Sequence, residues 1–210
     1  MPPRVFVIGA GGTTGLATVR SLRTAGFDVI AGVHSMNKSA APLERLGASV
    51  RHVEFEDVTG MAAAMSGADR LFVVTPVTHE TERLTALIAE AAKAAGIGYV
   101  AKLSGLGVDS EPEFALGRWH RAAERVIEAA GLDWTFLRPN AFMQNFCANA
   151  DSVKEQGIFY SPLGPAAVSY IDARDIGEVA AEVLSTDGHA GQIYSLTGPK
   201  VIHRETSQSS

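Results

Sequence analysis

The sequence has little cysteine and little excess charge. Cys147 is the one cysteine among 210 residues, which excludes a disulfide framework or a cysteine-rich zinc site within the chain and favours a reducing compartment. Lys and Arg number 18 against 23 Asp and Glu, so the net charge is only −5. Nucleic-acid-binding proteins usually carry a basic patch, and we therefore expect no nucleic-acid partner.

Long apolar runs are missing too. The first residues carry one positive charge and a short apolar run before glycines begin, which is too little for a signal peptide. No window approaches the roughly 20 apolar residues that a membrane helix needs. We therefore expect a cytoplasmic protein with no membrane partner. The 46% hydrophobic and 20% charged residues are typical of a globular chain with a sizeable core.

The sequence does contain an alternation of β-branched runs with alanine-rich stretches of helical spacing. Strands are predicted over Val5–Ile8, Asp28–Val33, Val50–Val53, Arg70–Val74, Tyr99–Leu103 and Trp134–Leu137. Helices are predicted over Thr14–Ala25, Leu43–Leu46, Glu80–Ala95, Leu116–Ala130 and from about Asp172 onward. This alternation predicts a doubly wound α/β fold, in which helices cover both faces of a parallel sheet.

A glycine-rich turn follows the first predicted strand. It reads Gly9-Ala10-Gly11-Gly12-Thr13-Thr14-Gly15. Glycine at every third position between a strand and a helix is the dinucleotide-binding fingerprint: one allows the tight turn, one lets the backbone approach the pyrophosphate and one lets the helix pack closely. The helix N-terminus then offers N–H groups to the phosphates. We predict that every residue of this turn binds the cofactor.

The end of the second predicted strand bears on the choice of dinucleotide. NAD-binding sheets usually carry a carboxylate there for the ribose 2′-hydroxyl, and none lies between His34 and Lys38. His34 and Lys38 offer positive charge, while Ser35 and Asn37 offer hydrogen bonds, which suits a 2′-phosphate. We therefore predict NADP(H) rather than NAD(H); the alternative is that both basic residues are ordinary solvated loop residues.

Further motifs extend over most of the chain. They are Phe72-Val73-Val74-Thr75-Pro76, Lys102-Leu103-Ser104, His120-x-x-x-Glu124, Gly131-Leu132-Asp133-Trp134-Thr135-Phe136-Leu137-Arg138-Pro139-Asn140-Ala141-Phe142-Met143-Gln144-Asn145-Phe146 and Tyr194-Ser195-Leu196-Thr197-Gly198-Pro199. With the glycine turn, they resemble the NmrA-like branch of the atypical short-chain dehydrogenases, which includes NADPH-dependent quinone reductases and redox-sensing regulators. The resemblance implies that Thr75 and Pro76 lie near the nicotinamide ribose. It also implies that Ser104 and the turn Pro139-Asn140-Ala141-Phe142 flank the nicotinamide.

The sequence departs from the family pattern in three places. His34 stands where many relatives have an arginine, and Glu54 stands where an aspartate commonly approaches the adenine. The sequence also ends soon after Pro199, where relatives continue. We therefore expect one NAD(P)-binding domain over residues 1–200, with small substrate-facing segments near residues 140–170 and a polar tail over residues 201–210. The substrate lobe is expected to be reduced or incomplete.

The Tyr-x-x-x-Lys dyad of classical short-chain dehydrogenases is absent, and His120 and Glu124 stand in the corresponding helix. In one hypothesis His120 donates a proton and Glu124 raises its pKa. In the other, the pair only holds the helix against the sheet. Lys102 either approaches the cofactor or extends outward to solvent. No metal site is predicted.

The segment after Asn140 leaves two interpretations open. Phe142, Met143 and Phe146 predict either an apolar wall for a flat substrate or ordinary helix-core residues. Cys147 has no basic neighbour in sequence, which favours a buried inert thiol over a redox sensor.

Two functions are consistent with these observations. The first is an NAD(P)H-dependent oxidoreductase that transfers hydride from NADPH to a quinone or similar flat acceptor, with solvent or His120 supplying the proton. The second is a non-catalytic NADP(H)-binding, redox-sensing regulator of the NmrA type. A third possibility is an incomplete chain whose exposed apolar surface would favour homo-oligomers.

Overall fold

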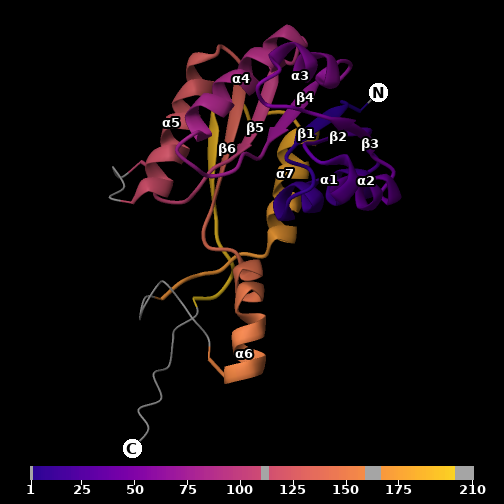
Figure 1. The fold of residues 1–210 in the computed structure, drawn as a ribbon. Helices are drawn as coiled ribbons and strands as arrows, with labels where there is room; N and C mark the ends of the chain where they lie inside the picture. Colours follow the sequence, from indigo (N-terminus) through magenta and orange to yellow (C-terminus); the bar gives the residue numbers. More distant parts are fainter. Residues whose placement is uncertain (1, 110–113, 159–166, 202–210) are drawn as a thin grey trace, which may run out of the picture.

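A parallel sheet of seven strands organises the computed structural model of the chain, which describes residues 2–109, 114–158 and 167–201 (Figure 1). The strands are β1 (Val5–Ile8), β2 (Val29–Val33), β3 (Ser49–His52), β4 (Arg70–Val73), β5 (Tyr99–Leu103), β6 (Asp133–Pro139) and β7 (Gln192–Leu196). Their order across the sheet is β3-β2-β1-β4-β5-β6-β7, and every neighbouring pair is parallel. The predicted doubly wound fold is confirmed. Ligands of such sheets bind where the strand order reverses, here between β1 and β4.

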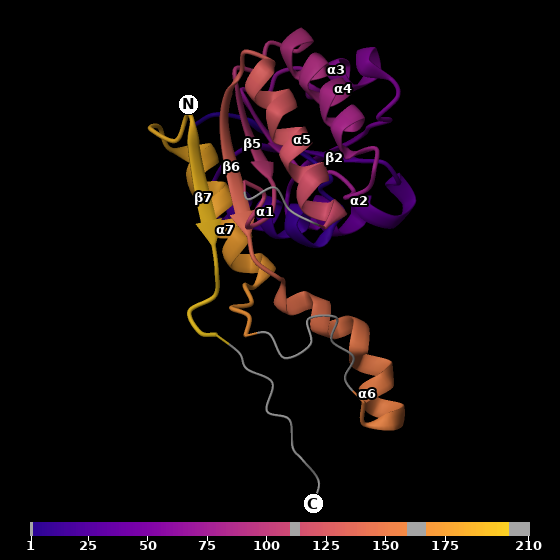
Figure 2. The same cartoon turned by 90° about the vertical axis from the view of Figure 1, so that its left-hand side faces the viewer.

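Helices cover both faces of this sheet (Figures 1 and 2). On one face lie α1 (Thr13–Thr24), α2 (Met36–Arg45) and α7 (Ala173–Ser185). On the other lie α3 (Val58–Met65), α4 (Thr81–Ala94) and α5 (Ala115–Ala129). Helices α1 and α7 approach so closely that a Cβ on Gly177 would lie 2.7 Å from the carbonyl carbon of Ala17. Only glycine allows this backbone-to-backbone contact.

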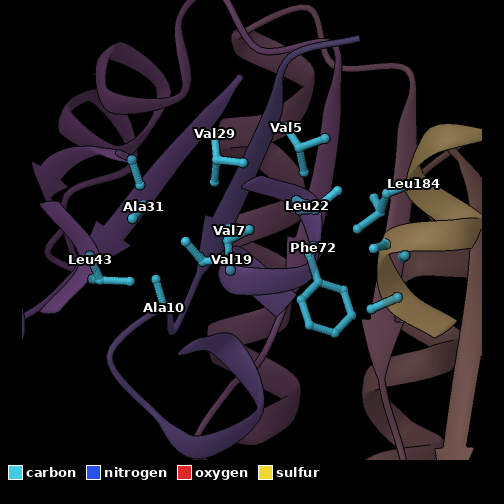
Figure 3. Close-up of a cluster of buried hydrophobic side chains, with 14 of the residues drawn as sticks. Val5, Val7, Ala10, Val19, Leu22, Val29, Ala31, Leu43, Phe72 and Leu184 are labelled. Atoms are coloured by element: carbon cyan, nitrogen blue, oxygen red, sulfur yellow. The ribbon is translucent and has the colours of Figure 1, made fainter. Parts of the chain in front are cut away.

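Each face has its own apolar core, because alternate side chains of a strand point to opposite faces. In β1, Val5 and Val7 join the first cluster, whereas Phe6 and Ile8 join the second. Figure 3 shows the first cluster, in which Leu22 of α1 packs with the side chains of β1. A run of apolar residues without polar interruption is what a strand buried on both faces requires.

Most predicted elements are found within a few residues of their expected bounds. Helix α2 is the exception, because it begins at Met36 and contains Pro42, a residue that usually breaks helices. The sequence pattern therefore predicted only its last turn. Helix α3 was missed, although Asp57 caps it by accepting a hydrogen bond from the Gly60 amide at 2.8 Å. Strand β7 was not predicted as a strand either.

Between β6 and α7 the chain leaves the sheet as a 3-10 helix, η1 (Met143–Asn149), followed by α6 (Ala150–Gln156). Both project beyond the carboxyl edge of the sheet (Figures 1 and 2), and none of their described residues is buried. Residues 159–166 and 202–210 lie outside the described part, so the segments expected near 140–170 and the tail over 201–210 are described only in part. Within that part, no helix has both the length and the apolar character to cross a membrane.

The projecting segment corrects two interpretations. Met143 is 37% exposed, and Phe146 is half-buried, with its ring centroid 4.6 Å from that of Tyr170. These residues are therefore not part of a helix core. Cys147 is exposed, so the expectation of a buried thiol is wrong. The physical reason is the same for both: η1 does not pack against the sheet.

Candidate cofactor-binding site

The glycine-rich turn connects β1 to α1 at the point where the strand order reverses. Gly9 has a φ of +74°, and a Cβ there would lie 2.3 Å from the carbonyl oxygen of Val74. A Cβ on Gly15 would lie 2.2 Å from the carbonyl oxygen of Gly9, so α1 packs directly on the turn. At Gly12, by contrast, a Cβ would meet only the Gly9 oxygen, at 3.4 Å. The turn is therefore closed on the protein side and open at Gly12.

Helix α1 starts at this open side without a side-chain cap. Gly12 occupies the N-cap position, and the first turn of the described helix contains no acidic residue. The first amide groups of a helix lack intrahelical acceptors and lie at the positive end of its dipole. Thr13 is exposed here, whereas Thr14 and Ala10 are buried. These features fit the pyrophosphate of a dinucleotide.

The ends of β2 and β3 form the neighbouring part of the edge. His34 is exposed, and its Nδ1 lies 3.3 Å from Oε2 of Glu54. Ser35 occupies the N-cap position of α2 without a side-chain cap bond, and Lys38 is exposed in the first turn, which holds no acidic residue. Sequence reasoning missed the contact between His34 and Glu54 because it joins two strands.

On the other side of the switch point, β4, β5 and β6 bring more of the predicted residues to the same edge. Thr75 follows β4 and is buried, with no hydrogen-bond partner for Oγ1 among the described residues. The Ser104 amide donates to Leu137 O at 2.7 Å, and the Asn140 amide donates to Leu196 O at 2.9 Å. Pro139 ends β6, Phe142 forms a bridge with Ile171, and Pro76 is exposed after β4.

Below this edge, buried charges join α5 to β6. Glu124 is fully buried and accepts hydrogen bonds from Arg138 Nε at 2.9 Å and Nη2 at 2.7 Å. Arg138 also pairs with Asp109, and its Nη2 lies 3.0 Å from Oδ1 of that residue. Burial acts to lower the pKa of Arg138, but the hydrogen bonds to Glu124 and Asp109 raise it above the usual value. Arg138 therefore remains a cation and compensates the buried Glu124.

Glu124 also determines how Ser104 can act. The Ser104 hydroxyl donates to Glu124 Oε1 at 2.6 Å, and both residues are buried. Because its proton is engaged there, the Ser104 oxygen presents lone pairs to the edge of the sheet. Ser104 is therefore prepared to accept a hydrogen bond from a ligand.

His120 lies on the same helix, but it does not pair with Glu124 as expected. The oxygens of Glu124 are engaged by Ser104 and Arg138, and His120 Nδ1 has no partner within the described part of the chain. Burial and the nearby charge of Lys102 lower the pKa of His120 to about 3. The hypothesis of a pKa raised by Glu124 is thus wrong, and His120 is a neutral imidazole at neutral pH.

Lys102 is fully buried, so the outward-pointing interpretation is also wrong. Its Nζ donates to Leu103 O at 2.8 Å. Burial lowers the pKa of Lys102 to about 8, although the charge of Glu124 acts to raise it. Sequence reasoning assigned no role to Arg138 or Asp109. The available signal was an arginine within the apolar strand Asp133–Pro139, which implied a buried partner.

A doubly wound sheet with an open glycine turn at its switch point defines a Rossmann-type dinucleotide-binding protein. Comparison with known proteins agrees. Residues 9–187 match the family model described as NAD(P)H-binding. The chain is 35% identical to NAD(P)H azoreductase of Xenophilus azovorans over 94% of this chain and 69% of that protein. It is 28% identical to quinone oxidoreductase 2 of Escherichia coli over 92% of this chain and 68% of that protein.

Solved structures give the same result. The NADPH-dependent quinone oxidoreductase of Escherichia coli complexed with NADPH superposes with a TM-score of 0.85 at 26% identity, over 95% of this chain and 71% of that chain. Triphenylmethane reductase of Citrobacter sp. complexed with NADP(H) has a TM-score of 0.83 at 24% identity, over 95% of this chain and 72% of that chain. The latter likeness concerns the fold alone.

The chain therefore belongs to the NAD(P)H-binding family, and the predicted relationship to NmrA-like reductases is confirmed. It is an NAD(P)H-dependent oxidoreductase by class. The chain spans about 70% of the length of the relatives and solved structures named above.

Proposed function

We propose that the protein transfers hydride from NADPH to a quinone or a similarly flat acceptor. Bound NADPH supplies the hydride, and the protein supplies binding and orientation. The names of the azoreductase and quinone-oxidoreductase relatives support this acceptor class. The substrate choice also rests on the protonation states of the residues beside the predicted nicotinamide position.

The observation that carries the proposal is that these residues are poor proton donors. His120 is neutral, with a pKa lowered to about 3 by burial and by Lys102. The hydroxyl proton of Ser104 is engaged by Glu124 at 2.6 Å, and Lys102 is fully enclosed. A ketone would need an acid at its oxygen. A quinone accepts hydride readily and takes its protons from water, so it suits this site.

The described residues offer NADP(H) partners at three places along the edge. The uncapped start of α1 at Gly12 suits the pyrophosphate. Ser35 and Lys38, at the start of α2, suit the 2′-phosphate, which leads us to prefer NADP(H) over NAD(H). Thr75 Oγ1 is buried without a partner among the residues that the structure describes, and Ser104 presents an acceptor oxygen, so both suit the nicotinamide ribose and carboxamide.

The acceptor is proposed to lie between this end of the cofactor site and the start of the projecting segment. Phe142, Met143 and Phe146 follow Asn140 and are exposed or half-buried. In the proposal they form the apolar wall against which a flat ring lies. Thus the exposure that excludes a helix-core role leaves these side chains accessible to a substrate.

The test is NADPH oxidation, followed by absorbance, with the full chain and a panel of para-quinones. We expect protein-dependent turnover that Gly12→Asp lowers at least about 100-fold, roughly 2.8 kcal/mol, because a carboxylate would face the pyrophosphate. Gly98→Asp is the matched control, since Gly98 precedes β5 at the opposite edge and a Cβ there meets nothing within 4 Å.

NADPH binding is measured in parallel by the fluorescence of the cofactor. Tight NADPH binding without turnover of any quinone would contradict the reductase proposal and leave the cofactor-binding regulator. Lys38→Ala further tests the 2′-phosphate assignment. It should reduce the preference for NADPH over NADH by about tenfold, the effect of 1.4 kcal/mol.

A further inference from the structure

Two histidines and a glutamate converge at the carboxyl ends of β2 and β3. His34, His52 and Glu54 are all exposed, and one ligand atom from each lies within 4.8 Å of the other two. His34 Nδ1 and Glu54 Oε2 are 3.3 Å apart, and the ring centroids of the two histidines are 6.2 Å apart. His34 is also a predicted cofactor-binding residue, whereas His52 has no part in the proposed cofactor site.

The backbone beneath the cluster is held by the sheet. Val33 and His52 are paired in the register of β2 and β3, and the Val53 amide donates to Val33 O at 3.0 Å. Val53, which lies between His52 and Glu54, is buried in the apolar core. The three side chains therefore start from fixed positions, which is what a binding site built on rigid elements needs.

The chemistry of the three side chains indicates which metal ion they would bind. Two imidazoles and a carboxylate are a common combination for Zn²⁺, whereas Ca²⁺ and Mg²⁺ prefer oxygen ligands throughout. With bonds of about 2.0 Å, two ligand atoms of a tetrahedral zinc ion lie about 3.3 Å apart. The observed contact between His34 and Glu54 has this length, and the ligand atom of His52 lies within 4.8 Å of both.

We propose that His34, His52 and Glu54 bind a zinc ion, with water at the fourth corner. Because β3 lies at one edge of the sheet, the ion joins the end of this strand to β2, its neighbour. Sequence analysis predicted no metal site, because the ligands come from two strands and form no short motif. The same chemistry makes Co²⁺ a spectroscopic probe for the site.

The structure also provides a matched control. His79 Nε2 lies 3.2 Å from Glu80 Oε1, a contact like that of His34 with Glu54. Among the described residues, however, no third ligand joins this pair. His79→Gln therefore removes an exposed histidine and its carboxylate contact without touching the proposed site.

The experiment is a calorimetric titration of ZnCl₂ into the full chain without cofactor, because the cofactor phosphates also bind divalent ions. All proteins carry Cys147→Ser, since that thiol is exposed and cysteine thiolates are zinc ligands. We expect one ion per chain, with affinity lowered at least about tenfold by His52→Gln or Glu54→Gln and unchanged by His79→Gln. Zinc should also raise the Tm of the parent protein but not that of His52→Gln.

Co²⁺ identifies the ligands independently of affinity. We expect the visible absorption of tetrahedral cobalt with nitrogen and oxygen ligands, and its loss in His52→Gln. Equal zinc affinity in the parent and in both His52→Gln and Glu54→Gln, or no stoichiometric binding, would overturn the proposal. Neither result bears on the reductase assay, which needs no metal.

Discussion

The two halves of the carboxyl edge of the sheet differ in the groups that form them: glycine backbone at the end of β1, and buried charged side chains at the ends of β5 and β6. At the end of β1 the glycines have no side chains. The backbone around Gly12 is therefore open to a ligand, and Gly9 and Gly15 allow the close packing behind it. At the ends of β5 and β6 it buries charged side chains, with Glu124 held by Arg138. The first half depends on local backbone shape. The second depends on a network in which every member needs its partner.

This difference predicts different responses to substitution. A buried ion pair contributes little net stability when complete but leaves an expensive unpaired charge when one partner is removed. In a glycine turn, a substitution is tolerated where the added Cβ would point into open space. It destabilises the fold where the added Cβ would clash with the backbone.

The largest effect is expected for Arg138→Met, which leaves Glu124 buried without its main cation. We expect a loss of about 3–5 kcal/mol in the free energy of unfolding, measured by urea denaturation. Adding Glu124→Leu should restore most of this loss, because the unpaired charge is then absent. As a control, Arg174→Met removes an arginine whose side chain is 75% exposed and should change stability little. Equal stabilities of Arg138→Met and Arg174→Met would refute the importance of the buried pair.

His120 should make the protein sensitive to acid. Its pKa is about 3 in the folded protein and 6.5 in the unfolded chain, so between these values the unfolded chain binds a proton that the folded protein does not. Stability therefore falls as pH decreases, by up to about 1.4 kcal/mol per pH unit from this residue. Urea denaturation from pH 6.5 to 4.5 should show a shallower dependence in His120→Leu. Parallel curves for the two proteins would exclude this role.

Within the glycine turn, Gly15→Ala and Gly12→Ala should differ. A Cβ on Gly15 would lie 2.2 Å from a backbone oxygen, whereas one on Gly12 would lie 3.4 Å from it. We expect Gly15→Ala to lower the free energy of unfolding by about 1–3 kcal/mol more than Gly12→Ala, the usual cost of overpacking. Thermal unfolding followed by circular dichroism measures both. Similar Tm values would show that the turn is less tightly packed than the distances indicate.

The smallest effect on stability is expected for Thr75→Val, because the Thr75 hydroxyl is buried without a described partner. Removing an unsatisfied hydroxyl should leave the free energy of unfolding unchanged or raise it by less than about 1 kcal/mol. NADPH affinity should nevertheless fall several-fold if this hydroxyl binds the cofactor as proposed. Calorimetric titration with NADPH provides the comparison. Unchanged affinity would remove Thr75 from the cofactor-binding residues.

The same contrast explains what could be predicted from the sequence. The strand at Val5–Ile8 and the glycine turn were predictable because each depends on neighbouring residues. The partners of Glu124 were not, because Arg138 and Ser104 lie 14 and 20 residues away from it in the sequence, and the fold brings them together. Asp109, which pairs with Arg138, is 29 residues from that arginine. Nearest-neighbour reasoning paired Glu124 with His120 one helical turn away. The exposure of Cys147 could not be predicted either, since it depends on η1 leaving the sheet.

The contact between Gly177 and Ala17 bears on how the chain folds during synthesis. Helix α1 comes much earlier in the chain than α7, yet the surface that receives α1 is completed only by α7. Until α7 leaves the ribosome, apolar side chains around Val19 and Leu22 lack part of their cover. The cofactor-binding half therefore cannot reach its final packing early, and a nascent chain exposes the apolar surface that chaperones recognise.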